Sequence, residues 1–437
     1  MKEINFSKEL ELKGYYERLE NGLEVYLVPM EKKDKYFITY ATKFGSIATQ
    51  FTPYKEKSER TVPNGVAHFL EHKMFEQEDG IDPFTFFSES GTDANASTNF
   101  DLTRYICYGT KNFDKNLRYL IKYVNSPYFT DENVEKEKGI IAQEINMYKD
   151  EAGYAIEDTL RKNTYHSDNH RVDIAGEVRD IEKITKEDLY LCYDNFYQPQ
   201  NMFLLVVGKF DVENVKSVVD EVLRPLKNKT GELPKIKQEK EKKPVKRESE
   251  VVPFNISIPK IMMSLKCERA RFDTKDEVKL DLYLNIILDL VFGNSSTFKE
   301  RVTNNNLLTK FYFDIETIKN YKTIYLYAES THPSELIEEI KKEFGSIEIS
   351  LEDLERYKKV LIASTIKCAD YVDAVTVGFT DDISKYGKII GNPIEICKSL
   401  DIKELNTVLK GIDFKNRAVV TYVPKNMPNL VKEEVNE

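Results

Sequence analysis

Two of the five histidines in this sequence lie four residues apart in "GVAHFLEHKMFE", residues 65–76. The apolar residues of this segment predict a buried helix, and the "PNG" just upstream predicts the turn from which it starts. On a helix, His68 and His72 leave the same face one turn apart, and Glu71 flanks the point between them. Two imidazole nitrogens that converge on one point predict a metal site.

Zinc is the metal that suits this pair best. Imidazole nitrogen is a preferred zinc ligand, and a catalytic zinc takes three protein ligands and leaves a fourth position for water. Glu71 is then the candidate general base, and the H-x-x-E-H order is the inverse of the commoner H-E-x-x-H motif. The alternative is two core or surface histidines at helical spacing by coincidence. With five histidines in 437 residues, chance produces the full pattern in on the order of one such chain in a few hundred.

A third ligand is expected from the acidic helical segment "EKEKGIIAQEINMYKDE", residues 135–151. Glu144 is embedded there among apolar residues, namely Ile140, Ile141, Ala142, Ile145 and Met147. A carboxylate on the apolar side of a helix is costly to bury without a partner, and zinc is such a partner. Glu137 lies two turns earlier on the same face, where it can accept a hydrogen bond from a ligand histidine. The alternative for Glu137 is a solvated surface residue.

Composition excludes several classes of protein. The chain has 41% hydrophobic and 32% charged residues, which is a globular balance, and its length predicts two to four domains. The formal charge of -10 disfavours nucleic acid as a partner. No segment reads as a signal peptide or reaches the length of a membrane span. The five cysteines are odd in number and lack a CxxC pair, which predicts a reducing cytoplasm and no cysteine metal site.

The order of patterns predicts a duplicated α+β unit. A stretch rich in Lys, Glu and Pro, residues 226–252, reads as a solvated linker between an N-terminal domain, 1–225, and a C-terminal domain, 253–437. Strand and helix patterns follow in similar order on both sides, and "VEKEKGIIAQE" (134–144) overlays "LERYKKVLIAS" (354–364) without a gap. Ser364 stands where the first copy has Glu144, so the second domain should bind no metal. The other histidines, His166, His170 and His332, are expected to be surface residues.

The HFLEH segment, followed 72 residues after His72 by Glu144, resembles the M16 family of metallopeptidases, the family of pitrilysin and mitochondrial processing peptidase. Three further blocks resemble the family: "GTDANASTNFDLTRY", "GEVRDIEKITKEDL" and "FYQPQNMFLLVVGKFD". The resemblance implies an α+β fold of two homologous domains, each a mixed, mostly antiparallel sheet packed with helices. It also implies that two such chains close around a chamber that admits unfolded peptides.

The resemblance assigns roles residue by residue. His68, His72 and Glu144 match the zinc ligands, Glu71 matches the base that activates water, and Glu137 matches a supporting glutamate. Two further residues, Asn95 and Ala96, match the short segment before an edge strand that pairs with extended peptide, a mode in which backbone hydrogen bonds hold the substrate. The alternative for Asn95 is a turn residue in "GTDAN".

The second half departs from the family pattern in "GNSSTFKERVTNNNLLTKFY". Many active chains carry here an Arg and a Tyr that grip substrate or stabilise the tetrahedral intermediate, but Thr303 and Lys310 occupy the two positions. Arg301 and Tyr312 lie nearby, out of register. Loss of one oxyanion donor costs roughly 10²- to 10³-fold in rate.

Two functions therefore stay open at this point. The first is a zinc endopeptidase, as a homodimer or as the zinc-bearing subunit of a heterodimer whose partner supplies the Arg and Tyr. Its motif also resembles bacterial subunits encoded in neighbouring gene pairs, some of them linked to maturing small peptides. The second is an inactive peptide-binding or assembly subunit that retains zinc for structure. Neither function involves nucleic acid or a membrane.

Overall fold

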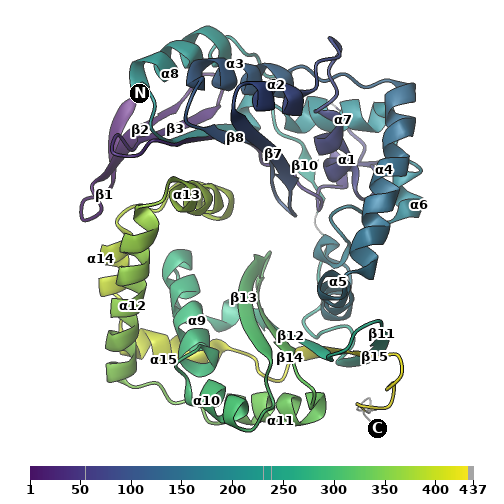
Figure 1. Ribbon diagram of the computed structural model, residues 1–437, viewed down its shortest axis with the longest axis vertical. Coiled ribbons are helices and arrows are strands. Elements are labelled where there is room, and N and C mark those ends of the chain that lie inside the picture. The colour runs from purple at the N-terminus through teal and green to yellow at the C-terminus, as the bar shows by residue number, and fades with distance from the viewer. Residues whose placement is uncertain (55, 230, 238, 432–437) are drawn as a thin grey trace. The chain divides into compact units, whose positions relative to one another are not determined.

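A computed structural model describes residues 1–54, 56–229, 231–237 and 239–431 (Figure 1). The chain forms two compact units, each built from three separate segments. The first comprises Met1–Ile145, Asp173–Gln238 and Ser364–Ile394, and the second comprises Asn146–Val172, Glu239–Ala363 and Glu395–Glu437. The predicted duplicated halves, 1–225 and 253–437, are each continuous in the chain. The compact units are not, because each of them includes a segment from the other half of the sequence. Positions 230 and 238 of the predicted linker, and 432–437 of the predicted second domain, lie outside the described residues.

The first unit contains a seven-stranded sheet in the order β1-β2-β3-β9-β4-β8-β7. Only β3 and β9 pair in parallel, and the other neighbours are antiparallel. The central strands β4 and β9 are buried at every residue, as their continuous apolar sequences require. The strands are β1 (Lys2–Ser7), β2 (Leu12–Arg18), β3 (Glu24–Pro29), β4 (Tyr36–Thr42), β7 (Thr92–Thr98), β8 (Thr103–Gly109) and β9 (Met202–Gly208), and a small second sheet contains β5 (Gln50–Thr52), β6 (Arg60–Thr61) and β10 (Lys235–Ile236).

The second unit contains a five-stranded sheet in the order β11-β15-β12-β14-β13. Its only parallel pair is β11 and β15, so order and directions match those of β3-β9-β4-β8-β7 in the first unit. This match confirms the predicted duplication and the predicted mixed, mostly antiparallel sheets. The strands are β11 (Ser249–Phe254), β12 (Lys260–Glu268), β13 (Lys310–Ile318), β14 (Tyr321–Glu329) and β15 (Arg417–Pro424).

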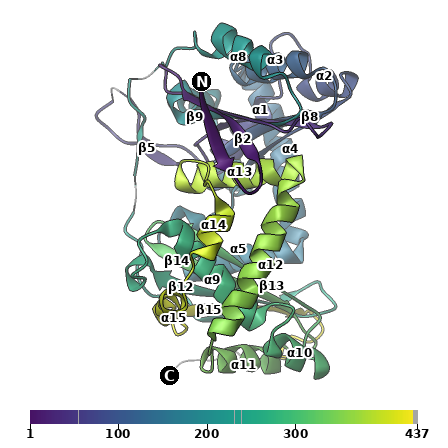
Figure 2. The same ribbon diagram turned by 90° about the vertical axis from the view of Figure 1, so that its left-hand side faces the viewer.

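Helices cover both faces of each sheet, because alternate residues of the central strands are buried on opposite sides. In the first unit, one face packs against α1, α3 and α7 and the other against α13 (Figure 2). In the second unit, one face packs against α9, α11 and α15 and the other against α5. The helices are α1 (Val66–Lys73), α2 (Pro83–Glu89), α3 (Phe113–Val124), α4 (Asp131–Asp150), α5 (Ala152–Thr164), α6 (Val178–Ile181), α7 (Lys186–Phe196), α8 (Val212–Val218), α9 (Glu277–Phe292), α10 (Thr297–Asn304), α11 (Pro333–Phe344), α12 (Leu351–Ala369), α13 (Val372–Tyr386), α14 (Pro393–Lys398) and α15 (Ile402–Gly411).

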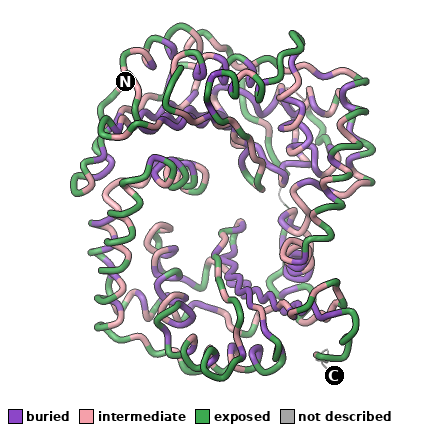
Figure 3. Tube along the Cα trace, in the orientation of Figure 1, coloured by how far each residue is buried: buried purple, intermediate pink, exposed green. Residues whose placement is uncertain are grey.

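The exchanged segments contain the helices that cover the second face of each sheet. α5 follows α4 in the chain but packs on β12 and β15 of the second unit. α13 follows α12 but packs on β4 and β9 of the first unit. Figure 3 shows the contrast between the buried sheet strands and the largely exposed α12. Two of the points at which the chain passes from one unit to the other therefore lie within the long helices α4 and α12, the segments that overlay in sequence.

The predicted linker is not solvated throughout. Glu241 is buried, and its carboxylate accepts hydrogen bonds from the backbone N–H groups of residues 166–168 and from Lys266 Nζ at 2.8 Å. Burial alone would raise the pKa of Glu241, but these donors lower it to about 2. The stretch is thereby anchored to the second unit, which sequence composition could not reveal.

The prediction that His170 is a surface residue is wrong. Its side chain is buried, and its Nδ1 lies 2.6 Å from Asp168 Oδ1. His332, by contrast, is exposed as expected. All five cysteines are free thiols. Across the described residues, no helix combines the length and the apolar character needed to cross a bilayer.

Candidate metal centre

The helix that contains the histidines, α1, begins at a glycine that the backbone requires. Gly65 has φ +84°, and a Cβ placed on it would lie 2.2 Å from the carbonyl oxygen of Ala175. Only glycine permits both this conformation and this close approach. The apolar side chains of α1 are buried in the first unit's core, namely Val66, Ala67, Phe69 and Leu70. This packing fixes the direction in which His68 and His72 leave the helix.

α1 and α4 together bring three potential ligands to one point. Single ligand atoms of His68, His72 and Glu144 all lie within 4.8 Å of one another. Glu144 Oε2 is 3.5 Å from His72 Nε2 and 3.9 Å from His68 Nε2. All three residues are half-buried, so each keeps some contact with solvent.

Only a narrow stripe of residues along α4 is buried, and its carboxylate groups lie beside that stripe. Ile141 and Ile145 are buried, whereas Ile140 and Met147 are 47% and 59% exposed. The expectation that Glu144 is embedded among apolar residues therefore holds for Ile141 and Ile145 but not for Ile140 and Met147. Glu144 lies at the border between the buried stripe and solvent, because only residues three to four apart share a helical face.

Glu137 is the next carboxylate of the cluster. Its Oε1 lies 3.0 Å from His72 Nδ1, and its Oε2 lies 3.5 Å from the Nζ of Lys73. Burial would raise the pKa of Glu137, but the hydrogen bond to His72 and the charge of Lys73 lower it overall. Glu137 is therefore placed to accept the Nδ1 proton of His72, and in the neutral ring this leaves the Nε2 lone pair on the side of Glu144.

His68 is held as a neutral ring. Burial lowers the pKa of His68 to about 3, and the neighbouring His72 adds to this effect. Its Nδ1 is buried and has no hydrogen-bond partner among the described residues. A neutral imidazole with an available Nε2 is the form that binds a metal ion.

Glu71 is buried one residue before His72, with 7% of its surface exposed. Thr98 Oγ1 donates a hydrogen bond of 2.6 Å to Glu71 Oε2. Burial raises the pKa of Glu71, and the bond from Thr98 offsets part of that effect. A carboxylate with a raised pKa beside a metal site can accept a proton and later release it.

The segment predicted to bind peptide lies in β7, at the edge of the first sheet. Asn95 and Ala96 are within this strand and not before it as expected, and Asn95 Oδ1 accepts a 2.9 Å hydrogen bond from the Ala96 N–H. A turn separates β7 from β8. Asn99 Oδ1 accepts from the N–H of Leu102 at 2.7 Å, a side-chain turn that ends β7 and starts β8.

Sequence reasoning missed two residues of this site, Lys73 and Thr98. Lys73 is fully buried and forms ion pairs with Glu76 and Glu137. A lysine within an apolar helical segment, three residues before a glutamate, was the only local signal for it. For Thr98 there was none, because its partner lies 27 residues away in the chain.

The second unit holds the residues that stand in place of the expected Arg and Tyr. Thr303 and Lys310 are exposed. The nearby Arg301 is committed to ion pairs with Glu339 and Glu343 of α11, at 3.1 and 2.6 Å. Tyr312 stacks on Tyr327 with ring centroids 4.5 Å apart. Arg301 is therefore engaged within its own unit, whereas stacking leaves Tyr312 45% exposed.

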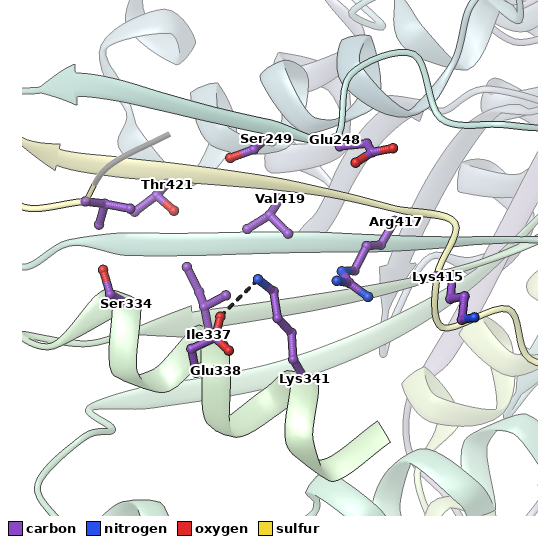
Figure 4. A pocket seen from close by; sticks show the side chains of 11 residues that line it. Glu248, Ser249, Ser334, Ile337, Glu338, Lys341, Lys415, Arg417, Val419 and Thr421 are labelled. Atoms are coloured by element: carbon purple, nitrogen blue, oxygen red, sulfur yellow. Dashed lines mark hydrogen bonds and ion pairs between the residues drawn. The ribbon is translucent and has the colours of Figure 1, made fainter. Parts of the chain in front are cut away.

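A cavity in the second unit is a weaker candidate site. Figure 4 shows that it lies between α11 and β15 and includes three basic side chains, Lys341, Lys415 and Arg417. Lys341 pairs with Glu338 at 3.0 Å. Among the described residues, no histidine or cysteine lines this cavity. It therefore lacks the donor set that the first unit provides.

Comparisons with known proteins agree with this geometry. Residues 57–177 match the family model described as Insulinase (Peptidase family M16), and residues 183–361 match the model described as Peptidase M16 inactive domain. The "Uncharacterized zinc protease YmfH" of Bacillus subtilis (strain 168) is 37% identical over 84% of this chain and 86% of its own. The chain belongs to peptidase family M16.

Two further M16-like proteins resemble this chain along most of its length. The "Zinc protease PqqE" of Helicobacter pylori is 25% identical over 78% of this chain and 74% of its own. A solved structure, that of a putative M16-like peptidase from Alicyclobacillus acidocaldarius, superposes with a TM-score of 0.86 at 29% identity. It covers 94% of this chain and 98% of its own.

The donor set of this M16 chain fits zinc. Two imidazoles and one carboxylate form a common three-ligand set of catalytic zinc sites. His68 is neutral, and a carboxylate faces the far nitrogen of His72, as ligand histidines require.

Proposed function

We propose that this chain is a zinc metalloendopeptidase that hydrolyses peptides or unfolded polypeptide segments. The observation that supports this proposal is the convergence of His68, His72 and Glu144 within 4.8 Å beside the buried Glu71. These three side chains would hold Zn²⁺. When bound, the ion would polarise the scissile carbonyl group and lower the pKa of a water molecule.

The remaining steps belong to side chains of this chain. Glu71 accepts the proton of the attacking water and delivers it to the leaving amine, with Thr98 holding its carboxylate. Glu137 holds the ring of His72 in one tautomer. These roles are supported by contacts within the first unit.

The substrate would add to the sheet as an extended strand. β7 is the last strand in the sheet order, so one side of its backbone is available for pairing. Asn95 and Ala96 lie at the middle of this strand, and Thr98 at its end contacts Glu71. Backbone pairing holds a peptide regardless of its sequence, which suits unfolded substrates.

A second homologous chain would complete the enzyme. Thr303 and Lys310 stand at the expected Arg and Tyr positions, and Arg301 is engaged by Glu339 and Glu343. We therefore assign this chain as the zinc-bearing subunit of a heterodimer for peptide processing or maturation, enclosing a chamber, with a homodimer as the alternative assembly. Its five free thiols support a reducing cytoplasm as its compartment.

The same observation favours a second candidate function. Without oxyanion donors the chain could serve as an inactive peptide-binding or assembly subunit that keeps zinc for structure. The retention of Glu71 argues against this candidate, because structural zinc needs no general base.

The deciding experiment is hydrolysis of an unstructured quenched-fluorescence peptide by the zinc-loaded full chain. Glu71→Gln is the test variant, and Glu135→Gln is the matched control because Glu135 is exposed and lies on α4. Cleavage that Glu71→Gln abolishes and Glu135→Gln preserves establishes a self-sufficient endopeptidase. That result would refute the heterodimer, whereas cleavage only in the presence of a homologous chain that carries the Arg and Tyr would support it. If zinc binds and the chain cleaves in neither case, the inactive subunit is correct.

A further inference from the structure

Lys73, the residue directly after the second histidine, is a fully buried cation. Lysine is almost never fully buried unless it is paired, because removing an ammonium group from water is costly. Its Nζ pairs with Glu76 and faces Glu137 Oε2 at 3.5 Å. The proposed hydrolysis gives this lysine no task.

Each carboxylate oxygen of Glu137 has a different partner. Oε1 lies 3.0 Å from His72 Nδ1, and Oε2 faces Lys73. His72 and Lys73 are neighbours on α1, whereas Glu137 projects from α4. A planar carboxylate that is held at both oxygens cannot turn about its last side-chain bond without losing one partner.

We propose that Lys73 is a positioning residue of the metal centre, which fixes Glu137 and through it the tautomer and ring orientation of His72. The inference rests on the proposed function for the identity of the metal. Lys73 would not itself hold the metal. It acts through one carboxylate, and its effect should vanish when that carboxylate is removed.

A purely electrostatic role for Lys73 predicts the opposite sign. A cation this close to a dication site repels the metal, so its removal would tighten zinc binding. A positioning role predicts weaker binding, because His72 would then lose a fixed orientation. The sign of the change therefore separates the two roles.

The test is the zinc dissociation constant of the metal-free full chain, measured by competition with a chromophoric chelator. Lys73→Met keeps the volume and removes the charge, and Lys122→Met is the control because Lys122 forms an ion pair with Asp79 at the surface. Loss of partners behind a ligand typically weakens metal binding 10- to 100-fold, so we expect about tenfold for Lys73→Met. Lys122→Met should leave the constant unchanged.

A double-mutant cycle tests the route of the effect. In a Glu137→Gln background, Lys73→Met should add nothing further, because the carboxylate through which it acts is gone. Unchanged or tighter binding by Lys73→Met, or a full additional loss in that background, overturns the proposal.

Nitrogen NMR of the His72 ring gives a readout that does not depend on the metal. At a pH where the His72 ring is neutral, wild type should show the Nδ1-protonated tautomer, and Lys73→Met should show a mixture of the two tautomers. Lys73→Gln, which keeps a donor for Glu137, serves in both measurements if Lys73→Met does not fold, and it should fall between the two. Failure of wild type to bind zinc would instead refute the proposed function, so the two failures are distinguishable.

Discussion

Thr98 Oγ1 lies 2.6 Å from Glu71 Oε2 and donates its only proton to that carboxylate. The neighbouring Thr103 Oγ1 donates to the carbonyl oxygen of Phe44 at 2.9 Å. Thr103 Oγ1 lies 3.3 Å from Thr98 Oγ1 and could only accept from it, so the shorter, charge-assisted bond to Glu71 is the stronger of the two when Glu71 is ionised. This bond joins β7, the strand proposed to bind peptide, to α1, the helix with the proposed base. Substrate position and base orientation are thus set by the same strand.

Replacing Thr98 tests this connection. Thr98→Val removes the donor while keeping the shape, so Glu71 loses a charge-assisted hydrogen bond of about 1.5–3 kcal/mol. We expect kcat to fall roughly 10- to 100-fold with little change in KM or in zinc content. Thr98→Ser keeps the hydroxyl group and should recover most of the rate. Steady-state kinetics on a quenched-fluorescence peptide measures both, and equal losses in the two variants would contradict the role.

Removing the third ligand should abolish metal binding without unfolding the chain. Glu144→Gln replaces a half-buried carboxylate, so the metal-free protein should keep its thermal midpoint. Zinc at 100 times its dissociation constant should stabilise wild type by about 2.7 kcal/mol and leave Glu144→Gln unaffected. Calorimetry with and without a chelator measures this difference. Glu135→Gln, on the same helix, should behave as wild type.

The start of α1 should be intolerant of any side chain. Gly65→Ala places a methyl group against the carbonyl oxygen of Ala175 at a backbone φ of +84°, so we expect a loss of at least about 1–3 kcal/mol in unfolding free energy. Gly139→Ala is the matched control, because nothing lies within 4 Å of its Cβ position on α4. That change should stabilise by about 0.5–1 kcal/mol. Urea denaturation of both variants tests the pair.

Asp382 on α13 should make stability depend on pH. Burial, with a smaller contribution from Asp381, raises the pKa of Asp382 from 3.8 to about 6, against the opposing effects of Lys385 and the N–H of Ile390. A raised pKa means that the folded state favours the protonated acid. Its contribution to stability is full below pH 3.8 and is lost as the pH rises through about 6.

Asp382→Asn should remove this dependence of stability on pH, because an amide does not ionise. The amide oxygen can still accept a hydrogen bond from the N–H of Ile390. The variant should be more stable than wild type above pH 6, and the difference should shrink as the pH falls towards 4. Urea midpoints at several pH values measure it. A constant difference at every pH would show that Asp382 does not titrate in this range.

The sequence predicted the helix of residues 65–76, the duplication, and the residues that gather at the metal centre. It misjudged the surroundings of several of them. Glu144 lies at a solvent border, Asn95 and Ala96 lie inside a strand, and Glu241 and His170 are buried. These errors share a cause, because burial depends on contacts made by segments distant in the chain.

What the sequence by itself determined is local. The spacing of His68, Glu71 and His72 sets their directions, since a helix turns once in 3.6 residues. The meeting of α1 with α4, the burial of Lys73, the bond from Thr98 to Glu71, and the exchange of α5 and α13 between units were decided by tertiary structure. No local periodicity specifies them, because they arise only when separate segments pack their apolar faces together.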